Sequence, residues 1–134
     1  MRTTLTRLLL ADQYQKLRYR CALAMYLLIL ILGSIPGARA DIGQYASGLV
    51  LHSAAYSVLT FLIFSGGPGT SLQRATQAVL TIMLMGALDE LVQSFVPYRH
   101  GAVSDWLVDC GAAVVSAVFL YVFLPGIKQR LLPS

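Results

Sequence analysis

Charged side chains are scarce in this sequence. They make up 12% of its 134 residues, about half of the ~25% that is typical of a soluble domain. Hydrophobic residues make up 57%, and the mean hydropathy is +0.68. A chain of this kind has too few polar side chains to cover a compact core. Its length allows one domain, and its composition predicts an integral membrane protein rather than a soluble or nucleic-acid-binding one.

Cysteine is also scarce, and several familiar catalytic motifs are missing. The two cysteines, Cys21 and Cys110, are too few for a disulfide framework, and we expect both to be free packing residues on opposite sides of the membrane. The sequence has no Gly-x-Ser-x-Gly turn, no catalytic cysteine arrangement and no phosphate-binding loop. These absences argue against nucleophilic serine or cysteine catalysis and against nucleotide binding.

Long apolar runs are what the chain does have. Four runs, at about 21–35, 45–65, 75–93 and 104–124, approach the ~20 residues needed to cross a bilayer. Backbone in lipid must satisfy its own hydrogen bonds, so the runs are predicted to be helices. Glycine and proline separate them, and we expect Pro125-Gly126 to end the fourth. Because the connections are short, we predict an all-α, polytopic integral membrane protein with four transmembrane helices in a compact bundle.

The basic residues predict the orientation. In this topology eight of the ten lie on one side, leaving Arg39 and Arg99 on the other; the eight are Arg2, Arg7, Lys16, Arg18, Arg20, Arg74, Lys128 and Arg130. The positive-inside rule then places both termini in the cytoplasm, in a bacterial cytoplasmic (inner) membrane. We expect a basic cytoplasmic segment (1–20), a four-helix membrane domain (21–124) and a cytoplasmic tail (125–134). The first segment is partly amphipathic, which suits a topology anchor or a helix lying on the inner surface.

A cleavable signal peptide is the alternative for the N-terminal part. The basic start, the short apolar run and Ala38-Arg39-Ala40 before Asp41 fit one. The other three helices keep the same orientation on either interpretation.

Four of the six acidic residues lie at the ends of apolar segments. Asp89 and Glu90 come late in the third, and Asp105 and Asp109 come early in the fourth. Ionisable side chains within a membrane segment are costly and usually face a partner or a functional site. An antiparallel bundle places these acids on the outer side, together with His52, Tyr56, Gln93 and Arg99. The sequence therefore predicts one polar site there.

The residue types allow several kinds of chemistry. Asp89, Glu90 and Asp105 are candidate catalytic acids or bases, although Asp105 could instead cap the fourth helix. The candidate binding residues are His52, Tyr56, Gln93, Arg99 and Asp109. The guanidinium of Arg99 suits a carboxylate or a phosphate. Repulsion among the acids could be offset by Mg²⁺ or Ca²⁺, by Zn²⁺ with His52, by a cationic substrate, by shared protons or by Arg99. No metal spacing is defined, so the sequence assigns no metal ligands and leaves the cofactor unknown.

The polar pattern resembles the signature of the VanZ-like membrane proteins. Asp89-Glu90-x-x-Gln93-x-Phe95-Val96-Pro97-x-Arg99, followed by Asp105, Asp109 and Gly111, is similar to that signature, and His52 and Tyr56 are similar to the His-x-x-x-Tyr of the family's second helix. The resemblance covers essentially the whole chain. Two positions depart from it, because Gly48 and Leu49 stand where the family often has a charged residue, and Asp109 stands where it has asparagine.

The resemblance implies a four-helix membrane protein of the cell envelope, with a link to low-level teicoplanin resistance. From it and from the residues we expect binding or modification of a lipid-linked or amphiphilic envelope molecule; whether catalysis occurs stays open. The alternative is a non-catalytic scaffold or partner subunit whose polar cluster locks the helices together. Small residues such as Gly111, Ala113 and Ala117 allow close helix approach in the bundle, in a homo-oligomer or with a membrane partner. A carrier is disfavoured by the small size and the absence of an inverted repeat.

Overall fold

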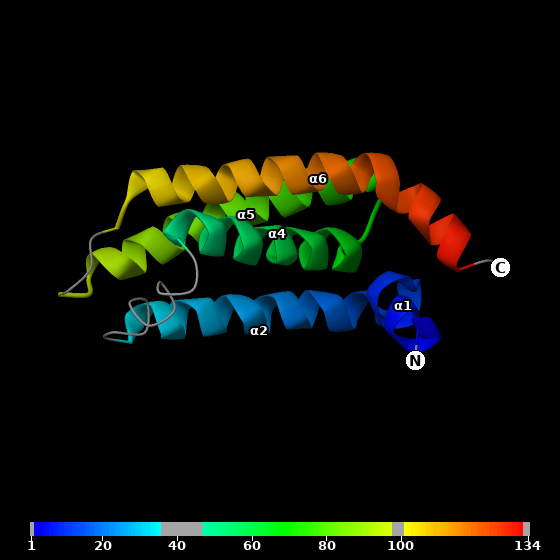
Figure 1. The fold of residues 1–134 in the computed structure, drawn as a ribbon, viewed down its shortest axis with the longest axis horizontal. Coiled ribbons are helices and arrows are strands. Elements are labelled where there is room, and N and C mark those ends of the chain that lie inside the picture. Colours follow the sequence, from blue (N-terminus) through cyan, green and yellow to red (C-terminus); the bar gives the residue numbers. More distant parts are fainter. Residues whose placement is uncertain (1, 36–46, 98–100, 133–134) are drawn as a thin grey trace.

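Four long helices form the protein. The computed structural model describes residues 2–35, 47–97 and 101–132. A short helix α1 (Arg2–Leu10) and a 3₁₀ turn η1 (Asp12–Tyr14) precede the bundle. The four long helices, α2 (Gln15–Ser34), α4 (Gly48–Gly66), α5 (Ser71–Ser94) and α6 (Val103–Leu131), lie side by side (Figure 1). No strand occurs in these three described stretches, so the predicted all-α four-helix architecture is confirmed.

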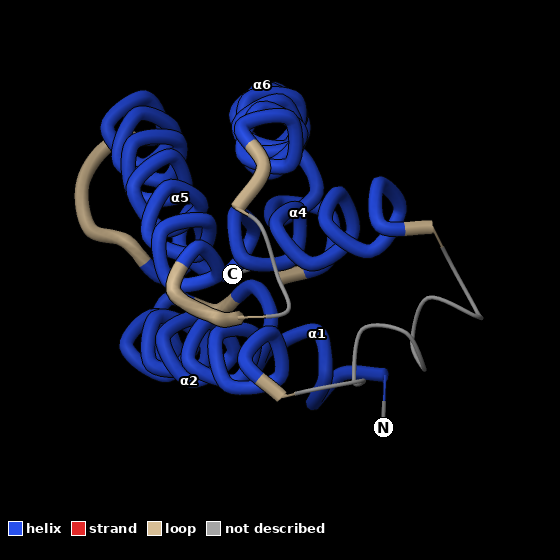
Figure 2. The backbone as a smooth tube through the Cα atoms, turned by 90° about the vertical axis from the view of Figure 1, so that its left-hand side faces the viewer, coloured by secondary structure: helices blue, strands red, loops and turns tan. Residues whose placement is uncertain are grey.

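Successive helices run in opposite directions along the bundle. In Figure 1, α4 and α5 lie between α2 and α6, and Figure 2 shows the four helices nearly end-on. The N-terminal end of α2, the connection between α4 and α5 and the C-terminal end of α6 therefore share one end of the molecule. We call it the terminal end. The opposite end holds the end of α2, the start of α4, the end of α5 and the start of α6.

The outer surface of the bundle is apolar. All four helices are long and apolar enough to cross a membrane, yet at most 33% of each apolar window is buried inside the protein. Leu80, Leu84 and Val115 on the outer faces are more than half exposed. Apolar surface on this scale would drive a soluble protein to associate, but it is the expected surface of a bundle in lipid. The fold is that of a multi-pass membrane protein.

Two helix boundaries have clear causes in the sequence. α5 begins at Ser71, several residues before the expected start, because Thr70 and Gln73 form a capping box with reciprocal side-chain-to-backbone hydrogen bonds. α4 ends at Gly66, where the expected glycine-rich break begins.

The expectation that Pro125-Gly126 ends the fourth helix is wrong. α6 continues to Leu131, and Figure 1 shows its last turns bending away from the axis of the bundle. Proline removes one backbone hydrogen bond and kinks a helix, but later residues can still pair their own backbone groups. An ion pair of 2.7 Å joins Lys128 Nζ in this extension to Asp12 Oδ1.

α2 begins at Gln15, earlier than expected, and Arg18 in its first turn is buried at the terminal end. Its guanidinium donates to the carbonyl oxygens of Leu8 and Ala11 at 2.9 Å and of Ser65 at 2.8 Å. These carbonyls lie at the C-terminal ends of α1 and α4, which carry partial negative charge. Arg18 thus joins α1, α2 and α4, and α1 packs back onto the bundle with Leu10 buried.

Two side-chain hydrogen bonds join α5 to its neighbours α2 and α6. The Tyr26 hydroxyl on α2 donates to the Met85 carbonyl oxygen at 2.8 Å, and the Trp106 indole on α6 donates to the Met83 carbonyl oxygen at 2.9 Å. The two cysteines are free, as expected. The candidate cleavage sequence at 38–41 lies outside the described residues.

Candidate functional site

The predicted site residues meet at the end of the bundle opposite the terminal end. His52 and Tyr56 lie in the first half of α4, Asp89, Glu90 and Gln93 in the last turns of α5, and Asp105 and Asp109 in the first turns of α6. Helices that alternate in direction bring these three regions together (Figure 1). Arg99, the remaining predicted residue, lies outside the described residues.

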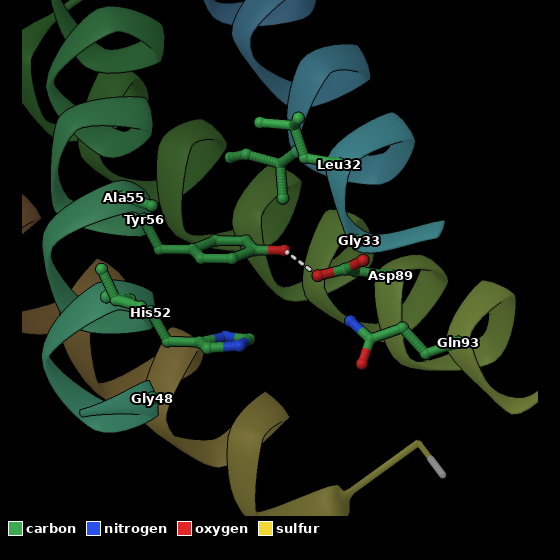
Figure 3. Close-up of a pocket in the computed structure, with 10 residues that line it drawn as sticks. Leu32, Gly33, Gly48, His52, Ala55, Tyr56, Asp89 and Gln93 are labelled. Carbon is green, nitrogen blue, oxygen red and sulfur yellow. Dashed lines mark hydrogen bonds between the residues drawn. The ribbon is translucent and has the colours of Figure 1, made fainter. Parts of the chain in front are cut away.

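One half of the site faces a crevice between α2, α4 and α5. Figure 3 shows His52 and Tyr56 pointing from α4 toward Asp89 and Gln93 on α5. The Tyr56 hydroxyl donates to Asp89 Oδ2 at 3.2 Å, and both side chains are almost completely buried. This bond ties the first half of α4 to the end of α5.

His52 links the crevice to α6. Its ring stacks parallel to that of Tyr56, with centroids 6.1 Å apart. Its Nδ1 lies 2.9 Å from Asp109 Oδ1, and its Nε2 lies 3.9 Å from Asp105 Oδ2. Asp109 is fully buried, whereas Asp105 is partly exposed. Two carboxylates on successive turns of α6 thus flank one imidazole.

Glu90 approaches the same imidazole from a different side of α5. It lies next to Gly101 and Trp106, away from the crevice. Its Oε2 accepts a hydrogen bond from the backbone N–H of Ala102 at 2.6 Å. Gly101 packs on the Glu90 backbone so tightly that a Cβ there would collide with the Glu90 carbonyl oxygen. The residues before α6 therefore hold the Glu90 carboxylate in place.

This arrangement changes the interpretation of Asp105. The N-cap residue of α6 is Ala102, and the side chain of Ala102 makes no capping bond. An N-cap supplies its side-chain oxygen from the residue just before the helix, and Asp105 is already within the first turn. Asp105 can still interact favourably with the positive end of the α6 dipole.

Several buried acceptor atoms in the site lack a donor. Within the described parts of the chain, no hydrogen bond reaches Glu90 Oε1, Gln93 Oε1 or Asp109 Oδ2. All three side chains are at least nine-tenths buried. A buried acceptor without a donor costs about 1–3 kcal/mol, and more when it is charged. Among the described residues, the hydrogen bonds of the site therefore do not satisfy all its acceptors.

The crevice has apolar walls and a polar floor. Its volume is about 210 Å³. The walls come from Ile29, Leu32, Gly33, Gly48, Leu51 and Ala55, and the polar floor from His52, Tyr56, Asp89 and Gln93. Leu32 is partly exposed on α2, so the crevice reaches the outer surface of the bundle.

Gly86 is a site residue that the sequence analysis missed. A Cβ at this position would lie 3.1 Å from Asp109 Oδ2 and 3.1 Å from the Trp106 ring. Glycine thus lets α6 bring the Asp109 carboxylate against α5. An isolated glycine inside a helical pattern costs stability and often marks such a close approach, which is the signal that could have found it.

Comparison of the chain with family models, curated proteins and solved structures finds no match.

Proposed function

We propose that the chain is a VanZ-like protein of the bacterial cytoplasmic membrane that binds or modifies the polar end of a lipid-linked or amphiphilic envelope molecule. The observation that carries this proposal is the crevice, which joins apolar walls to a polar floor within one small volume. Ligand sites are typically apolar clefts with a few converging polar groups. The apolar chain of an amphiphile matches the walls of this crevice, and its polar head group matches the floor.

The polar floor has chemistry for a head group. The Tyr56 hydroxyl and the ring nitrogens of His52 can donate or accept hydrogen bonds. The Gln93 carbonyl oxygen has no donor within the described chain. Asp89 adds a carboxylate that is held by Tyr56. If the molecule is modified as well as bound, Asp89 is the acid in the crevice that is placed to transfer a proton, because Glu90 faces Gly101 and Trp106 instead.

The distribution of charge supports an outward orientation of the crevice. The basic residues whose side chains are described, apart from histidine, lie in α1, early α2, early α5 and late α6, at the terminal end. Under the positive-inside rule, this distribution supports a cytoplasmic location for the terminal end and both termini. The crevice and the acids then lie at the outer end, where envelope molecules are accessible.

Photolabelling with a photoreactive lipid that carries an amino-sugar head group tests the proposal, because Asp89 and the Gln93 carbonyl oxygen offer acceptors to its donors. The wild-type chain in nanodiscs should be labelled in a saturable way. Ala55→Phe fills the crevice and should lower the apparent affinity at least about tenfold, which is 1.4 kcal/mol of binding free energy. Val58→Phe adds the same ring to an exposed position of α4 and should label like the wild type. Equal labelling of the two variants, both folded by thermal unfolding, would contradict a binding crevice.

A phenotype test follows from the VanZ-like resemblance. Expression in a susceptible host should raise the inhibitory concentration of teicoplanin, and Glu90→Ala and Arg99→Ala should abolish the effect while membrane insertion remains intact. An unchanged phenotype in both variants excludes a role for the polar site in it.

The scaffold alternative is supported by one specific observation. Tyr56–Asp89 and His52–Asp109 join α4 to α5 and to α6. If the cluster serves only as an interhelical lock, Asp89→Asn should lower the unfolding temperature in detergent, and photolabelling should not depend on Ala55.

A further inference from the structure

We propose that His52, Glu90 and Asp109 form a binding site for a divalent transition-metal ion next to the crevice, with which it shares His52. One side chain comes from each of α4, α5 and α6. Each can offer a ligand atom, and these atoms lie within 4.8 Å of one another. Ligand atoms about 2.1 Å from a tetrahedral ion are about 3.4 Å apart, so side-chain shifts of about an ångström close the set.

Unsatisfied acceptors point to a ligand at this place. Glu90 uses Oε2 to accept from the Ala102 N–H, which leaves Oε1 without a donor within the described chain. Asp109 uses Oδ1 to contact His52, and its Oδ2 also has no donor within the described chain. Both side chains are at least nine-tenths buried. A cation bound between the two side chains would be a partner for acceptors of this kind.

The charge balance supports the same conclusion. Asp89, Glu90 and Asp109 are buried, and Asp105 lies 3.9 Å from the His52 ring. In the described chain, His52 is the one basic side chain at this end of the bundle. Several carboxylates close together in a membrane protein are costly without a compensating positive charge. A divalent ion supplies two such charges.

The ligand set selects the class of metal. One imidazole and two carboxylates suit a borderline ion such as Zn²⁺ and also admit the harder Mn²⁺, whereas Ca²⁺ and Mg²⁺ prefer sites made of oxygen alone. All three ligands are side chains of the bundle itself.

Metal titration of the purified full-length chain tests the site. After treatment with chelator, the detergent-solubilised protein should bind one Zn²⁺ per chain by calorimetry, in the presence of excess Mg²⁺. Glu90→Gln and Asp109→Asn each remove a charged ligand with little change of shape and should weaken binding about tenfold to a hundredfold or more. Asp12→Asn, an exposed acid at the terminal end, should bind like the wild type. Wild-type affinity in both site variants would overturn the proposal.

A glycine pair provides a second test that removes no ligand. Gly86→Ala presses on Asp109 Oδ2 and should weaken Zn²⁺ binding, whereas Gly111→Ala, with open space at its Cβ, should leave it unchanged. If the site variants fail to fold, pulsed EPR of the Mn²⁺-loaded wild type decides, because one imidazole nitrogen should couple to the ion. Absence of that coupling overturns the site. No amphiphile is used in these measurements, so their failure is distinguishable from failure of the crevice assay.

Discussion

Arg18 illustrates how a residue expected to act through charge alone can hold the fold together. In the sequence it is one of several basic residues before an apolar run. In the structure its guanidinium is buried and donates to carbonyl oxygens of Leu8, Ala11 and Ser65. Those carbonyls lie at helix ends, where they have no intrahelical donors. The fork of an arginine can reach several acceptors at once, which the single ammonium of a lysine does less well.

Replacing Arg18 should therefore destabilise the protein. Arg18→Gln leaves buried carbonyl oxygens without donors and is expected to lower the free energy of unfolding by about 2–4 kcal/mol. The matched control is Arg20→Gln, two residues further on and exposed, which should change stability little. Thermal unfolding in the same detergent measures both. Equal effects of the two substitutions would mean that Arg18 acts only through its charge.

At the scale of the helix, glycine sets how closely two elements approach. A Cβ at Gly66, the last residue of α4, would lie 2.7 Å from the backbone nitrogen of Tyr19 and 2.9 Å from the carbonyl oxygen of Gln15, both on α2. Backbone atoms cannot move aside as a flexible side chain can. Gly66 thus allows the contact between α2 and α4 that Arg18 reinforces from the other side.

Gly66→Ala is expected to push α2 and α4 apart and to destabilise the protein by about 1–3 kcal/mol, as overpacking does elsewhere. Gly126→Ala is the matched control, because nothing lies within 4 Å of its Cβ position in α6. There the change should be neutral or stabilising by up to about 1 kcal/mol, from helix propensity. Chemical denaturation in mixed micelles measures the difference. Loss of stability at Gly126 but not at Gly66 would contradict the close approach.

Some helix boundaries can be predicted from local sequence signals, and others cannot. Thr70 and Gln73 fit the capping-box pattern, so the start of α5 could have been predicted from the sequence. The continuation of α6 through Pro125 could not, because proline is a local helix-breaking signal. Lys128 in this extension pairs with Asp12, 116 positions away in the chain, but the pair is largely exposed and contributes little to stability.

For the whole molecule, the proposed orientation gives a prediction about access from outside the cell. In a background with Cys21→Ser and Cys110→Ala, Ser94→Cys at the end of α5 should react with a membrane-impermeant maleimide in intact cells. Gln129→Cys, exposed near the end of α6, should react only after the membrane is opened. The reverse pattern would place the crevice on the cytoplasmic side and would exclude uptake of molecules from the envelope side.

Much of the site was predictable from the sequence, because helical spacing and alternation of direction place polar residues at one end. His52, Tyr56, Asp89 and Asp109 meet as expected. It was not predictable which acids face the crevice and which face away from it. Asp89 faces the crevice, whereas Glu90, its neighbour in the chain, faces Gly101 and Trp106. Consecutive residues on a helix point about 100° apart, and only the positions of α2 and α6 decide what each one meets.

The sequence by itself determined the class of protein, the helix number and the end of the bundle at which the acids gather. Apolar length, backbone hydrogen bonding and charge distribution are properties of the chain, and they leave a membrane bundle few alternatives. Only the tertiary structure decided which carboxylate oxygens are satisfied, that Gly86 admits Asp109, and that His52 lies between the crevice and the acids. Those outcomes depend on distances of a few ångströms between separate helices, and such distances are set by packing across the whole bundle.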